Sequence, residues 1–178
     1  MKVWLGYYLA KIWGKILRNE YHYLNKWFQK QGVHFKRDGI EEPIICCNIA
    51  KNEPSLIEIG DGTVISGNVE LITHDFSISR INREFKNLFG KISIGKNCFV
   101  GNGAIILYGV TIPDNVIIAA GSVVTKSVTE SNVIIAGNPA KVISTWDAFY
   151  EKNKEYNLKK HQLSNLSDAE SERYLVKR

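Results

Sequence analysis

The stretch Ile94–Thr129, IGKNCFVGNGAIILYGVTIPDNVIIAAGSVVTKSVT, divides without a gap into six blocks of six residues. Each block begins with an aliphatic residue, and its fifth place holds a small or β-branched residue. The fourth place is Gly or Asn in five of the six blocks. These two residue types tolerate a positive φ better than the others. The sequence therefore predicts a corner in the chain every six residues.

The same pattern begins earlier, at Ile59, with the three blocks IGDGTV, ISGNVE and LITHDF. A strand that turns every six residues closes a three-sided coil after about eighteen, and stacked coils bury their aliphatic side chains as a solenoid does. The glycines and the many β-branched residues exclude a helix here. The sequence thus predicts an all-β core in the form of a parallel β solenoid.

The run CFVGNGAIILYGVTIPDNVIIAAGSVVTKSV, followed by IIAGNPAKVI, resembles the hexapeptide-repeat acyltransferases. The likeness covers about residues 55–145 and is greatest to the sugar and xenobiotic O-acetyltransferases, including those of surface-polysaccharide biosynthesis. It implies a left-handed parallel β-helix. It also implies a homotrimer, with sites between neighbouring subunits.

The repeat breaks at one place. His74 occupies a corner position, Asp75 occupies an inward position, and the pattern is lost through residues 77–93. Alternatively, Leu88–Ser93 is a degenerate block and the insertion is 77–87. Local rules that fail together beside a loop indicate function. The alternative is that a histidine simply adopts the left-handed corner.

An imidazole titrates near neutrality and suits the chemistry of acyl transfer, which must remove a proton from the attacking group and return one to the leaving group. The resemblance implies that His74 is this general base and that no acyl-enzyme forms. Asp75 is expected either to orient the ring or to cap the turn.

The resemblance also implies acetyl-CoA as the acyl donor. Small residues would let its pantetheine arm approach the strand edges, and cations would face its phosphates. Asn102 departs from the family, which commonly has a hydroxyl residue at this place. Each of the expected cofactor contacts also has a purely structural explanation, because small side chains fit tight corners and surface lysines are usually solvated. The expected cofactor contacts are Asn102, Ala120, Thr125, Lys126 and Lys141, and the expected acceptor contacts are Phe99 and Arg83.

The 178-residue chain carries a net charge of +5, but residues 1–37 alone carry +7 and the remaining residues sum to −2. Apolar residues recur at helical spacing from Leu5 to Phe28, with lysines between them. We therefore expect one amphipathic helix over residues 1–32. It either packs on protein or makes a peripheral contact with the inner face of a membrane. No nucleic-acid motif accompanies the charge.

The three cysteines form no disulfide framework or metal motif, which favours a cytoplasmic chain. With one histidine in the coils, a zinc site is not expected. We expect three segments: helix 1–32, β-helix 33–144 with a loop insertion at about 77–93, and a C-terminal helical cap at 145–178, with helices at Thr145–Tyr156 and Ser167–Val176.

The predicted function is transfer of an acetyl group from acetyl-CoA to a hydroxyl of a sugar or of a lipid- or nucleotide-linked polysaccharide precursor. The alternatives are N-acetylation of a nucleotide-linked amino sugar, serine O-acetylation, and a scaffold without catalysis.

Overall fold

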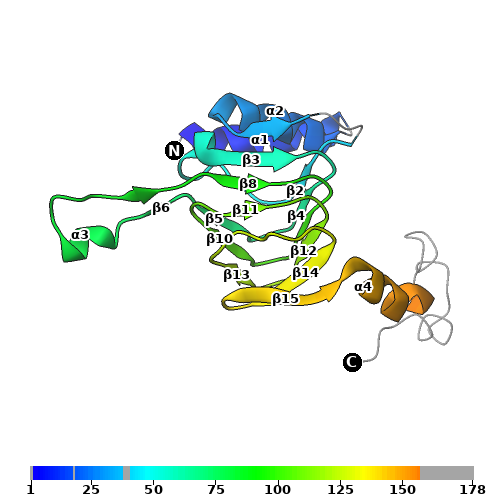
Figure 1. Cartoon of the computed structure of the whole chain (residues 1–178). Coiled ribbons are helices and arrows are strands. Elements are labelled where there is room, and N and C mark those ends of the chain that lie inside the picture. The colour runs from blue at the N-terminus through cyan, green and yellow to red at the C-terminus, as the bar shows by residue number, and fades with distance from the viewer. Residues whose placement is uncertain (1, 18, 38–40, 157–178) are drawn as a thin grey trace. The chain divides into compact units, whose positions relative to one another are not determined.

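The computed structural model describes residues 2–17, 19–37 and 41–156. Three sheets dominate residues 34–143, and the chain visits them in turn (Figure 1). Sheet A has the order β1-β3-β8-β11, sheet B the order β15-β14-β12-β9-β4-β2, and sheet C the order β13-β10-β5. We call one circuit through the three sheets a coil. The strands are β1 (His34–Lys36), β2 (Ile44–Ile45), β3 (Ile57–Gly60), β4 (Val64–Ile65), β5 (Glu70–Ile72), β8 (Ile92–Ile94), β9 (Phe99–Val100), β10 (Ile105–Leu107), β11 (Thr111–Ile112), β12 (Val116–Ile118), β13 (Val123–Val124), β14 (Val133–Gly137) and β15 (Ala140–Thr145).

The stacked strands from β1 to β14 run parallel, and those formed by the uninterrupted hexapeptide blocks keep the eighteen-residue register that the blocks predict. Ser93 pairs with Thr111 and Ile105 with Val123, each eighteen residues further along the chain. The nine block-initial side chains are all buried and form the columns of the core. Burying one such side chain contributes about 1.5–3 kcal/mol, so the stacked columns are the main source of stability. The three columns consist of Ile59, Ile94 and Ile112; of Ile65, Val100 and Ile118; and of Leu71, Ile106 and Val124.

The predicted corners are confirmed. All seven Gly and Asn residues at the fourth place have a positive φ, between 51° and 77°. A side chain with a Cβ is strained there, and Gly or Asn lowers that cost. They are Gly62, Asn68, Asn97, Gly103, Gly109, Asn115 and Gly121.

The N-terminal segment differs from the prediction of one helix. It forms two, α1 (Lys2–Ile16) and α2 (Glu20–Gln31), and α2 ends at Gly32 in the left-handed conformation. The break allows α2 to fold back along α1: a Cβ on Gly14 would lie 2.5 Å from the Glu20 Cα. Leu24 and Phe28 of α2 are buried in the core. Within the described residues, no helix combines the length and apolar character needed to cross a membrane.

Described residues 144–156 belong to a compact unit separate from residues 2–143. It contains α4 (Trp146–Asn153), which the Thr145 hydroxyl caps by accepting a hydrogen bond from the Ala148 N–H at 3.3 Å, and the 3₁₀ turn η2 (Lys154–Tyr156). The first expected C-terminal helix is therefore present, while its role as a cap stays a prediction. The second, Ser167–Val176, lies outside the described residues.

Candidate functional site

His74 lies where the chain leaves the coils. It follows β5 and begins β6 (His74–Asp75), which pairs antiparallel with β7 (Leu88–Phe89). Between them lies the short helix α3 (Ile78–Ile81), and the whole segment extends away from the sheets (Figure 1). His74 is not among the residues with positive φ, so it does not adopt the left-handed corner. We call residues 74–89 the excursion.

The excursion is shorter at its C-terminal end than the expected insertion of 77–93. Gly90 is already back beside the coil, where its N–H donates to the Thr73 carbonyl at 3.0 Å. Ile92 and Ile94 are fully buried in sheet A. Burial of aliphatic side chains in the core therefore resumes at Ile92, although the six-residue spacing is less evident in the sequence at this point.

A carboxylate that the sequence analysis did not single out holds the His74 ring. Glu53 Oε2 lies 2.9 Å from His74 Nδ1 and also accepts a hydrogen bond from the Thr73 hydroxyl at 2.5 Å. Because an ionised carboxylate only accepts, Nδ1 carries the proton in this contact and the lone pair of the neutral ring lies on Nε2. His74 Nε2 makes no hydrogen bond to any residue that the structure describes.

The charge state of Glu53 supports this assignment. Burial raises the pKa of this carboxyl, but the hydrogen bonds from Thr73 and His74 outweigh burial and lower its pKa below the ordinary value. The carboxylate is therefore ionised at neutral pH and stabilises a positive charge on the ring. Histidine and carboxylate together form the arrangement typical of an oriented general base.

Asp75 has other partners. Its carboxylate accepts the Ser77 N–H at 2.7 Å and the Tyr108 hydroxyl at 3.2 Å, and chiefly the Ser77 contact lowers the pKa of Asp75. Burial and the Asp75 carboxylate raise the pKa of the Tyr108 hydroxyl. Of the two roles expected for Asp75, the geometry fits capping of the turn. Glu53 orients the ring instead.

The other predicted residues lie at two different corners. Thr125 and Lys126 follow sheet C, on the same side as His74 and Tyr108 but further along the stack. Asn102 and Ala120 lie between sheets B and C, on adjacent coils, with the Gly121 N–H bonded to the Asn102 carbonyl at 2.9 Å. Phe99 belongs to sheet B and is exposed. One chain therefore does not bring all the predicted contacts together.

Two predicted cations do meet. Lys126 and Lys141 line one cavity of about 280 Å³ beside β13 and β15, together with Ser127, Thr129 and Glu130. Arg83 lines a separate cavity of similar volume within the excursion, with Arg80, Lys86 and two phenylalanines, Phe76 and Phe85. Among the described residues no three His, Cys, Asp or Glu side chains are grouped as metal ligands.

Comparison with known proteins agrees with this architecture. The family model described as the hexapeptide repeat of succinyl-transferase matches residues 91–126. Protein CapG of Staphylococcus aureus is 43% identical over 125 residues, which are 64% of this chain and 72% of that protein. The chain belongs to the hexapeptide-repeat acetyltransferase family.

Two sugar O-acetyltransferases are also similar to this chain. The galactoside O-acetyltransferase of Escherichia coli (strain K12) is 34% identical over 110 residues, 61% of this chain but only 52% of that protein. The crystal structure of a maltose O-acetyltransferase from Clostridium difficile 630 superposes with a TM-score of 0.54 at 25% identity, over 80% of this chain and 87% of the other.

Proposed function

We propose that this chain transfers an acetyl group from acetyl-CoA to a hydroxyl of a carbohydrate, with His74 as the general base. The observation that carries the proposal is the contact between Glu53 and His74, which leaves Nε2 without a hydrogen bond to a described residue. The ring is one-third exposed, so a substrate can reach it. Relatives named as galactoside and maltose O-acetyltransferases support a sugar hydroxyl as the acceptor.

The reaction follows from this geometry. The acceptor oxygen attacks the thioester carbonyl carbon, and Nε2 of His74 takes the hydroxyl proton as the C–O bond forms. The ionised Glu53 stabilises the imidazolium. The tetrahedral intermediate then expels the CoA thiolate by breaking the C–S bond, and Nε2 returns the proton to sulfur. The ester and the thiol leave, and no bond to the protein forms.

The cofactor would be held by the cations and small residues described above. Lys126 and Lys141 share a cavity and would face the CoA phosphates. Thr125 directly precedes Lys126 in the chain and would contact the same part of the cofactor. Ala120 and Asn102 lie at the other corner, where a small side chain leaves the strand edge open.

Since these two corners do not meet within one chain, we further propose a homotrimer of left-handed β-helices in which neighbouring subunits complete each site. Arg83 and Phe99 would then contact the acceptor. A solution mass of three times the 20.2 kDa chain is expected, and a monomeric active enzyme would exclude shared sites.

The test of the catalytic proposal is His74→Ala, assayed for thiol release from acetyl-CoA with a panel of free sugars and glycosides. We expect at least a hundredfold loss of kcat, within the range that general-base catalysis contributes. The matched control is His34→Ala, because His34 is an exposed histidine of β1. Full activity of His74→Ala would refute the assignment.

A further inference from the structure

The outer side of α1 is apolar. Five large side chains, at helical spacings of one, three and four, are 46–64% exposed. A helix at a protein surface normally turns its apolar stripe inward and its charged residues outward. In α1 the apolar stripe faces outward instead. We call these residues the outer face: Leu5, Tyr8, Leu9, Ile12 and Ile16.

Small residues explain the reversal. Gly6, Ala10 and Gly14 recur every fourth residue, and a Cβ on Gly6 would lie 2.6 Å from Trp27 Nε1. Tyr7 of α1 is buried against Trp27 and Phe28. Because α1 uses the small residues to pack closely on α2, the five residues of the outer face are left on the side that α2 does not cover. The outward stripe is thus built into the helix pairing.

Unpaired cations accompany the outer face. Lys15, Lys26 and Lys30 are exposed, and within the described chain none of them has a carboxylate at ion-pair distance. Lys11 does have one, Glu20, at 3.9 Å.

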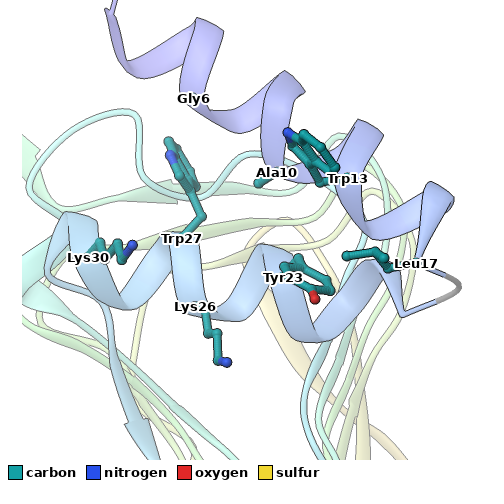
Figure 2. A pocket seen from close by; sticks show the side chains of 8 residues that line it. All are labelled: Gly6, Ala10, Trp13, Leu17, Tyr23, Lys26, Trp27 and Lys30. Atoms are coloured by element: carbon teal, nitrogen blue, oxygen red, sulfur yellow. The ribbon is translucent and has the colours of Figure 1, made fainter.

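A groove of about 380 Å³ runs between the two helices (Figure 2). Trp13 of α1 and Tyr23 and Trp27 of α2 line it, and Lys26 and Lys30 lie along α2 beside them. Aromatic rings and lysines next to an apolar surface are the residues that favour a membrane interface.

We propose that α1 and α2 dock on the surface of an anionic phospholipid bilayer. The outer face enters the boundary between headgroups and acyl chains, and Lys15, Lys26 and Lys30 contact lipid phosphates. Charge complementarity favours this partner over a second copy of the chain. The N-terminal segment of a copy would bring the same lysines, which repel one another. The rest of a copy, residues 38–178, carries a net charge of only −2 to attract them. This inference does not depend on the proposed acetyltransferase activity.

The experiment measures co-sedimentation of the full chain with vesicles. One set contains phosphatidylcholine alone, and the other contains phosphatidylcholine and phosphatidylglycerol in roughly a 2:1 ratio, which supplies the anionic surface. We expect binding to the mixed vesicles that weakens with added salt. Each lysine near such a surface contributes about fivefold, so Lys15→Gln/Lys26→Gln/Lys30→Gln lowers the partition coefficient by about a hundredfold.

A second variant, Leu5→Ser/Ile12→Ser/Ile16→Ser, removes apolar surface that is already exposed, so the fold is retained while vesicle binding is lost. The control Lys51→Gln/Lys152→Gln/Lys154→Gln removes the same charge elsewhere and should bind like the unchanged chain.

Three results would overturn the proposal. The first is no binding of the unchanged chain to the mixed vesicles, and the second is an equal loss of vesicle binding in the control variant. The third is a serine variant that binds the vesicles normally but has a lower solution mass. The last would show that the outer face contacts another copy. Thiol release with a soluble sugar should be unchanged in both test variants, which keeps this outcome separate from that of the proposed activity.

Discussion

Replacing Glu53 by glutamine removes a charge from the site without changing its shape. The amide oxygen can still accept from His74 Nδ1, so the ring keeps its place, but the imidazolium formed during the reaction loses its anionic partner. We therefore expect the variant to bind acetyl-CoA normally and to turn over slowly. Glu53 acts through His74 and is a positioning residue.

The magnitude follows from the contact. A hydrogen bond of 2.9 Å between a carboxylate and an imidazole is charge-assisted, and such bonds are worth about 1.5–3 kcal/mol. Both side chains are about one-third exposed, so solvent screening places the effect in the lower part of that range. A loss of about 2 kcal/mol corresponds to roughly a thirtyfold fall in kcat/KM.

The assay is thiol release from acetyl-CoA as a function of pH, with KM for the donor measured separately. The decrease should lie in kcat, with KM for acetyl-CoA unchanged. Glu70→Gln, which changes an exposed carboxylate paired with Lys51, is the matched control. A kcat/KM within twofold of the unchanged enzyme, or a fall that lies in KM and not in kcat, would refute the role given to Glu53.

Three other changes test the fold. Glu58 joins Lys36 and Lys91 across sheet A, and burial, which raises its pKa, is outweighed by these contacts, which lower it to about 2. Glu58→Gln should therefore cost about 2 kcal/mol of unfolding free energy at neutral pH, after screening by solvent around the lysines. Urea titrations measure this difference in unfolding free energy between the variant and the unchanged chain. The full difference should be present above about pH 4.5, the ordinary pKa of a glutamate, and should disappear as the pH falls through about 2. A difference that stays constant down to pH 2 would contradict the role given to Glu58. Gly101→Ala places a Cβ 2.5 Å from the next coil's backbone nitrogen, and should lower stability by about 1–3 kcal/mol, measured as a fall in Tm; an unchanged Tm would show that the coils can separate there. Ile106→Ala opens a cavity in a fully buried column and should cost about 2–5 kcal/mol, whereas the same change at exposed Ile81 should cost little.

The coils were predictable because each of their rules is local. Six-residue spacing places the column residues and the Gly and Asn corners, and the structure follows it from Ile59 to Thr73 and again from Ile94 to Val124. The sequence also located His74, because a corner residue and an inward residue break the pattern together.

The partner of His74 was not predictable in the same way. Glu53 precedes Pro54 and η1 (Pro54–Leu56) outside any hexapeptide block, 21 residues before His74. Only the stacking of one coil on the next brings its carboxylate to the ring. The division of the N-terminal segment was missed for a related reason. The apolar period continues through both helices, while the small residues that allow them to fold back are visible only as gaps in that period.

The excursion is an addition to the coils at the candidate site. Ile57 pairs with Ile92, 35 residues on, where an uninterrupted coil would need eighteen, so seventeen residues are added without disturbing the sheet. The two ends of the addition, Thr73 and Gly90, remain hydrogen-bonded to each other. Its length and composition can therefore change during evolution at little cost to the core. His74 and Glu53 stay at its base, where the contact between them does not depend on the residues further out.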